Sequence, residues 1–135
     1  KRSLTLKGVA GAAISIAAPF ALLAAAPALA APGDMSVATF LAKANALLAK
    51  GPLALFSGDA GLLRKEATAA GEAYKERLKL EQAAGKPSSC PPRGKAPDQD
   101  MWLAHLRSYP AAARPETSVR SAMADLYRKK WPCRG

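Results

Sequence analysis

The sequence predicts an all-α protein, a small bundle of about four helices that ends in a helical hairpin. The first observation is compositional. After residue 30 the chain holds 21 Ala, and its only β-branched residues are Val37, Thr39, Thr68, Thr117 and Val119. Ala and straight-chain residues lose little conformational freedom in a helix, whereas β-branched residues favour strands. The second observation is periodicity, because four segments carry apolar residues three or four positions apart and are separated by Gly or Pro.

The first predicted helix begins after Ser36, whose hydroxyl can cap the free N–H groups of a first turn. It ends at Gly51-Pro52, a pair that breaks helices. The short apolar patch that follows, residues 53–56, is predicted to form a single turn. The stripe expected to face the core consists of Val37, Phe40, Leu41, Ala44, Leu47 and Leu48.

The second predicted helix runs from about Ala60 to Ala84, with Asp59 as its cap. Gly85 and Pro87 are expected to stop it. The small residues at positions 67–71 suggest that a neighbouring segment approaches closely there. The inward stripe is predicted to be Leu63, Ala67, Ala70, Tyr74 and Leu78.

Residues 86–97 are predicted to form an extended loop, because four of these twelve residues are proline. This loop is the one candidate internal boundary. Either half of the chain alone would be too small to bury a convincing core. Residues 31–135 are therefore expected to form a single helical domain.

The third predicted helix opens at Asp98 and runs to about Tyr109, where Pro110 ends it. A fourth follows a Thr117 or Ser118 cap and ends in a basic last turn, which suits the negative end of a helix dipole. The expected inward residues of these two helices are Trp102, Leu103, Leu106 and Tyr109, then Val119, Ala122, Met123, Leu126 and Tyr127.

Residues 1–30 have the pattern of a cleavable secretory signal peptide. A basic start with Lys1, Arg2 and Lys7 precedes an apolar stretch at 9–23, and Ala28-Leu29-Ala30 fits the small-x-small cleavage rule. We expect cleavage after Ala30, a periplasmic or secreted location, and no stable membrane insertion afterwards. The alternative is an uncleaved anchor, because no charged residue occurs between residues 8 and 33.

The expected compartment determines how the two cysteines are interpreted. In an oxidising environment Cys90 and Cys133 most simply form one disulfide, which would clamp the hairpin of the last two helices. The alternative is a reactive thiol. No neighbouring residue of Cys90 would lower the pKa of its thiol, so the structural disulfide is favoured.

Residues that could support catalysis or hold a metal are sparse. His105 is the one histidine, and its place beside the apolar stripe favours packing over catalysis. Glu72 and Glu76 lie one turn apart on a charged helix face and are interpreted as solvated. Asp98 and Asp100 lack the later ligands of a calcium loop. The sequence therefore predicts no enzyme, no metal and no cofactor.

The charge of the chain is strongly positive, with 20 Lys and Arg against 10 Asp and Glu. Without residues 1–30 the balance is 17 against 10, or +7. The densest group is Arg128, Lys129, Lys130 and Arg134, a candidate surface for an acidic protein or an anionic envelope component. A solvated helix end is the simpler interpretation. Nucleic acid is not an expected partner of an exported protein.

The last third of the chain, residues 89–133, resembles the Rap/Tai-type immunity proteins. The pattern runs from Ser89-Cys90-Pro91-Pro92 through a helix with Trp102 and Leu106 to Ser108-Tyr109-Pro110. It continues with Thr117-Ser118-Val119 and closes with Trp131-Pro132-Cys133. These immunity proteins are small exported helical proteins that neutralise peptidoglycan-cleaving amidases delivered by type VI secretion. The resemblance implies the Cys90–Cys133 bridge and core positions for Trp102, Leu106, Val119 and Leu126.

Two functional hypotheses follow. The first, from the resemblance and the export signal, is an inhibitor that binds and blocks a cell-wall hydrolase in the periplasm. Its loop at 86–97 could contribute to the blocking surface. The second, from the basic residues, is a non-enzymatic periplasmic scaffold bound to anionic envelope components. The sequence leaves the partner, the contact face and the oligomeric state open.

Overall fold

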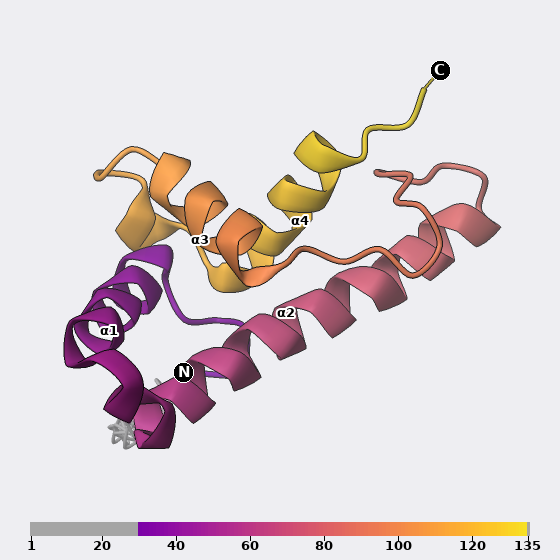
Figure 1. Ribbon diagram of the computed structural model, residues 1–135. Helices are drawn as coiled ribbons and strands as arrows, with labels where there is room; N and C mark the ends of the chain where they lie inside the picture. Colours follow the sequence, from indigo (N-terminus) through magenta and orange to yellow (C-terminus); the bar gives the residue numbers. More distant parts are fainter. Residues whose placement is uncertain (1–29, 135) are drawn as a thin grey trace, which may run out of the picture.

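The computed structural model describes residues 30–134, and within this range the prediction of an all-α protein with four helices is confirmed. The helices are α1 (Val37–Lys50), α2 (Gly58–Ala83), α3 (Gln99–Ser108) and α4 (Val119–Lys130) (Figure 1). Two 3-10 helices, η1 (Gly51–Phe56) and η2 (Arg114–Glu116), connect them. The predicted signal peptide lies outside the described residues, apart from Ala30 at its end.

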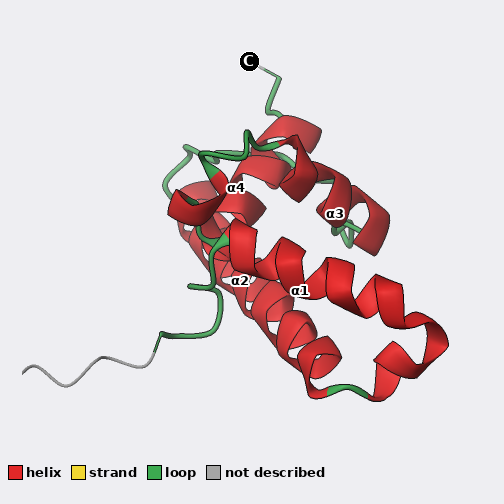
Figure 2. Ribbon diagram, turned by 90° about the vertical axis from the view of Figure 1, so that its left-hand side faces the viewer, coloured by secondary structure: helices red, strands yellow, loops and turns green. Residues whose placement is uncertain are grey.

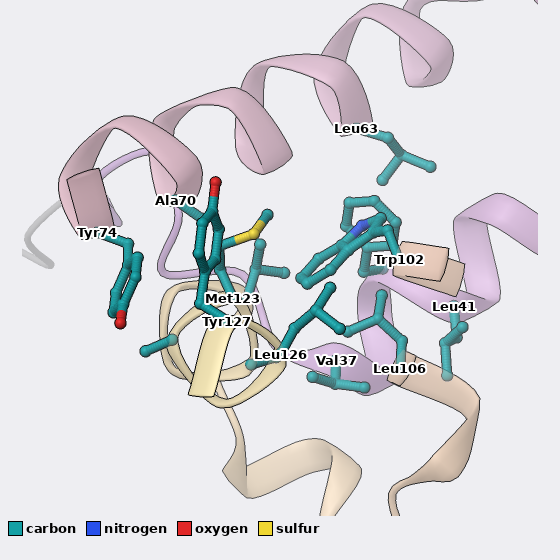
Figure 3. Close-up of a cluster of buried hydrophobic side chains, with 14 of the residues drawn as sticks. Val37, Leu41, Leu63, Ala70, Tyr74, Trp102, Leu106, Met123, Leu126 and Tyr127 are labelled. Carbon is teal, nitrogen blue, oxygen red and sulfur yellow. The ribbon is translucent and has the colours of Figure 1, made fainter. Parts of the chain in front are cut away.

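The long helix α2 is the base on which the other helices pack. In Figures 1 and 2, α4 lies along α2, while α1 and α3 complete the bundle on the same side. Side chains from all four helices form one core (Figure 3). It contains Val37, Phe40, Leu41, Ala44, Leu63, Ala70, Tyr74, Leu78, Trp102, Leu106, Val119, Ala122, Met123, Ala124, Leu126 and Tyr127.

The starts of the helices are set by side-chain caps. Ser36, Asp98 and Ser118 each accept a hydrogen bond from the N–H group three residues later, as the sequence predicts. The predicted cap of α2 is wrong. Ser57 is extended and caps the helix, so α2 begins at Gly58, and the Asp59 carboxylate instead pairs with Lys43 at 3.0 Å. A hydroxyl on the extended residue just before the helix satisfies the free N–H groups earlier than Asp59 could.

The prediction that Leu48 faces the core is also wrong, because its side chain is 59% exposed. The core positions of α1 end at Ala44, with Leu47 only partly buried against the core. The last turn of α1 and the following η1 lie at the edge of the molecule in Figure 2, so Leu48 has no core opposite it.

The disulfide predicted between Cys90 and Cys133 is confirmed, with an S–S distance of 2.00 Å. A backbone bond accompanies it, since the N–H of Cys90 donates to the carbonyl of Trp131 at 2.7 Å. Bridge and hydrogen bond together fix the loop that follows α2 to the end of α4.

The segment before α1 is held by a residue that the sequence analysis did not single out. Glu66 of α2 is only 7% exposed, and its carboxylate accepts from the backbone N–H of Gly33 at 2.6 Å and of Met35 at 3.4 Å. From the other side, the N–H of Val119 donates to the carbonyl of Met35 at 2.8 Å. The chain ahead of α1 is therefore inserted between α2 and the start of α4.

Candidate functional site

The positive charge of the described residues is concentrated at one end of the molecule. This end, called here the basic end, comprises the second half of α2, the 86–97 loop and residues 125–134, which lie together in Figure 1. Its ten cations face four carboxylates, a balance of +6 out of +7 for residues 30–134. The cations are Lys75, Arg77, Lys79, Lys86, Arg93, Lys95, Arg128, Lys129, Lys130 and Arg134, and the carboxylates are Glu72, Glu76, Glu81 and Asp125.

The four basic residues predicted as a partner-binding cluster differ in their contacts. Arg128 donates to Asp125 at 2.5 Å, and the ammonium of Lys129 lies 5.9 Å from the ring centre of Tyr109. Lys130 and Arg134 are exposed. The last two are therefore the residues of the cluster best placed to meet a partner.

The predicted residues of the C-terminal half lie in the core. Trp102, Leu106, Val119 and Leu126 are between 0% and 5% exposed. Trp102 also packs edge-on against Phe40 of α1, with ring centres 5.7 Å apart. These residues support the surface of the C-terminal half from within the core and are not themselves exposed for contact with a partner protein.

The carboxylates considered for acid–base chemistry lie on the surface. Glu72 and Glu76 are 62% and 67% exposed and pair with Lys75 and Lys79, respectively. The pKa of Lys79 is raised by its hydrogen bond and charge interaction with Glu76. Both glutamates act as partners of helix cations.

His105 is a buried packing residue, 7% exposed, in contact with Tyr109, whose hydroxyl links the end of α3 to α4. The hydroxyl of Tyr109 lies 3.2 Å from His105 Nε2 and donates to Asp125 at 2.6 Å. That hydroxyl gives its one proton to Asp125, and the direction of its contact with His105 depends on which ring nitrogen carries the imidazole proton. Burial, followed by the charge of Lys129, lowers the pKa of His105, and burial raises the pKa of Tyr109. The hydrogen bonds among His105, Tyr109 and Asp125 hold α3 against α4.

Acidification is expected to weaken the fold through His105. Its pKa is lowered by folding, so the unfolded chain binds the proton more readily. The stability it contributes is present above about pH 6.5 and is lost as pH falls towards the lowered value. Thermal melting between about pH 7.5 and pH 5.5 should therefore show a falling Tm, and His105→Gln should flatten this slope. An equally steep slope in the variant would assign the acid sensitivity to other groups.

An apolar groove, which the sequence did not predict, opens beside α2. Its volume is about 610 Å³, and its walls come from α1 with η1, from α2, from α3 with the residues before it, and from Met123 and Tyr127 of α4. The small residues of α2 explain it. Ala70 faces the inserted chain at Gly33, as the predicted close approach requires, but Ala67 and Gly71 line the groove and leave it unfilled.

Large exposed apolar side chains continue the groove at η1. Leu53 is 78% exposed, Leu55 is 74% exposed and Phe56 is 89% exposed, and Leu48 lies beside them at the end of α1. Soluble monomers rarely cluster such residues unless the surface has a binding role. The apolar run at residues 53–56 is visible in the sequence, but the run alone does not show whether other parts of the protein bury these side chains.

Trp102 lines the groove, and its indole N–H is buried without a hydrogen-bond partner. The side chain is 5% exposed, and its Nε1 makes no hydrogen bond. Figure 3 shows the nitrogen on the side of the ring that faces α2 and Leu63, which line the same groove. A buried donor left unsatisfied costs about 1 to 3 kcal/mol.

Residues 30–134 contain no cluster of His, Cys, Asp or Glu that could hold a metal ion. Within the same range no single helix is long and apolar enough to cross a membrane. The segment Val37–Phe56 passes that test only together with α2, as a pair bent by 101°.

Comparison with known proteins adds no relative: the chain matches no family model, no curated protein and no solved structure.

Proposed function

We propose that this protein is an exported inhibitor of the immunity type, which binds and blocks a peptidoglycan-degrading enzyme in the periplasm. It acts without catalysis, by occupying the enzyme's cleft. The observation that carries the proposal is the basic end, where a balance of +6 is gathered on a surface held in place by a disulfide.

The basic end is built to bind without much reordering. The Cys90–Cys133 bridge fixes the loop to α4, and the Tyr74 hydroxyl lies 2.6 Å from that of Ser89. Glu81 accepts from the N–H of Ser88 at 2.8 Å, which ties the loop to the end of α2. A surface that is ordered before binding loses less entropy on association, so more of the contact energy appears as affinity.

The charge of the basic end favours an acidic partner surface. Complementary charges speed the encounter and reject partners of the same sign. The resemblance of residues 89–133 to the Rap/Tai-type immunity proteins, and the disulfide, which is typical of oxidising compartments, support a cell-wall hydrolase as this partner.

The same charge also favours the second candidate, a scaffold that binds anionic envelope components. The two candidates differ in stoichiometry and in salt dependence. Binding to an anionic polymer or membrane surface would be spread over many sites and would weaken steeply between low and moderate ionic strength. An enzyme inhibitor would form a complex of fixed ratio and would abolish hydrolysis.

The test is capture of envelope proteins by the disulfide-bonded protein, followed by a peptidoglycan hydrolysis assay with each captured enzyme after purification. We expect one hydrolase to be recovered and to lose activity at an equimolar ratio. Lys130→Glu with Arg134→Glu should weaken this inhibition at least tenfold, or about 1.4 kcal/mol. The matched control is Lys50→Glu with Lys65→Glu, which makes the same charge change at exposed positions away from the basic end.

Failure to recover a hydrolase, or recovery of one that keeps its activity, would reject the inhibitor proposal. Equal weakening by both double variants would show that net charge matters and that the basic end is not the contact surface.

A further inference from the structure

The groove beside α2 has the dimensions of a ligand site. Its volume of about 610 Å³ lies within the range of small-molecule sites, about 300 to 1,000 Å³. Along α2 its lining runs from Ala60 to Lys75, a length of about 22 Å at the rise of an α-helix. The groove is thus elongated along the helix axis and suits a long, narrow molecule.

The two ends of the groove differ in polarity. At the η1 end the lining is Leu47, Leu48 and Leu55, and the exposed Phe56 follows in the chain. At the other end the lining includes the ion pair of Glu72 with Lys75, together with Asp98 and Gln99 at the start of α3. A molecule that fits both ends has an apolar tail and a polar head.

Trp102 adds a specific requirement between these ends. Its indole N–H is buried and has no acceptor. The nitrogen lies on the side of the ring that faces Leu63 of α2, a residue that also lines the groove (Figure 3). The nitrogen has no accessible surface, so an oxygen atom reaches it only when side chains that line the groove beside it move aside. An occupant with an acceptor oxygen would satisfy the donor.

We propose that the groove binds a single-chain acyl lipid. The acyl chain lies between α1 and α2 and leaves over η1, an acyl oxygen accepts from Trp102 Nε1, and the head lies beside Lys75 and Gln99. This site shares Glu72 and Lys75 with the edge of the basic end, but it does not depend on the proposed inhibitor function. A lysophospholipid supplies an ester carbonyl for Trp102 and a separate head group, whereas in a free fatty acid the one carboxylate meets Trp102 and no group reaches Lys75.

The test is calorimetric titration of the purified disulfide-bonded protein with laurate and with lauroyl-lysophosphatidylglycerol, each below its micelle concentration. We expect saturable binding of one molecule per chain, and the tighter ligand of the two identifies the head group. The ether analogue of the lysophospholipid lacks only the carbonyl, and it should bind at least fivefold more weakly than the ester.

Two variants and one spectrum locate the ligand. Ala67→Phe should fill the groove and abolish binding, whereas Ala83→Phe, on the exposed end of α2, should leave binding unchanged. Circular dichroism and Tm show whether each variant keeps the fold. In the nitrogen-proton NMR spectrum, the indole signal of Trp102, distinguished from Trp131 by Trp131→Phe, should move downfield when the lipid binds.

The absence of saturable binding by either lipid would overturn the proposal. Equal affinity for ester and ether together with an unmoved indole signal would also overturn it, since the Trp102 hydrogen bond is part of what is proposed. If the parent protein proves to be a dimer that Ala67→Phe dissociates, a second copy covers the groove and the lipid assignment is wrong.

Discussion

Replacing Cys133 by Ser is expected to lower the free energy of unfolding by about 4 kcal/mol. The bridge to Cys90 spans 43 residues and encloses α3 and α4. Its loss frees this length of chain in the unfolded state, which gains entropy relative to the folded one. For a domain of about 100 residues, a change of this size corresponds to a fall in Tm of about 15 to 30 °C. Thermal unfolding followed by circular dichroism measures it.

The fold of the Cys133→Ser variant should persist at low temperature, because other contacts hold the same place. The N–H of Cys90 still donates to Trp131, and Tyr74 still bonds Ser89. Near-ultraviolet circular dichroism should therefore match that of the parent. Reductant should lower the Tm of the parent to that of the variant and leave the variant unchanged. Equal melting temperatures for parent and variant would show that the bridge contributes nothing to stability.

The features of the fold that sequence could predict are those determined by neighbouring residues. The caps at Ser36, Asp98 and Ser118 follow from an oxygen-bearing side chain directly before an apolar period. The exit of α2 near Gly85 follows from local backbone chemistry in the same way. Asp59 shows where this reasoning fails, because Ser57 and Asp59 were both capable caps and the ion pair with Lys43 on α1 engages the second.

The features that sequence could not predict depend on residues far apart in the chain. Whether Leu48 is buried depends on where α1 extends beyond the end of the core. The spacing of apolar residues within α1 carries no information about that point. The groove depends on the distance between α1 and α2 at Ala67, since the same small residue permits either close packing or an open space. The acceptor role of Glu66 joins residues 33 positions apart.

The candidate sites follow the same division. The run Arg128, Lys129 and Lys130 was visible as a local cluster, but the cations that α2 and the loop add to it are assembled by folding. Trp102 was predicted as a core residue and lies in the core, yet its unpartnered N–H could be recognised only from the surrounding structure.

Replacing Glu66 by Ala is expected to destabilise the fold by about 2 to 3 kcal/mol. The substitution removes the carboxylate that accepts from the N–H groups of Gly33 and Met35. These two donors, which lie between α2 and α4, then have no acceptor from Glu66. The inserted chain also carries Ser36, the cap of α1, and accepts from Val119 at the start of α4. Its release should therefore weaken two helix starts. Urea denaturation measures the loss of stability.

A local effect distinguishes this role from general damage. In Glu66→Ala the amide hydrogens of Gly33 and Met35 should exchange faster with solvent than in the parent, by a larger factor than amides in the middle of α3. Glu66→Gln keeps one acceptor oxygen and should recover part of the stability. The control is Glu76→Ala, whose exposed carboxylate pairs only with Lys79 and whose loss should change stability by less than about 0.5 kcal/mol. If Glu66→Ala and Glu76→Ala had the same small effect, the buried carboxylate would not anchor the chain ahead of α1.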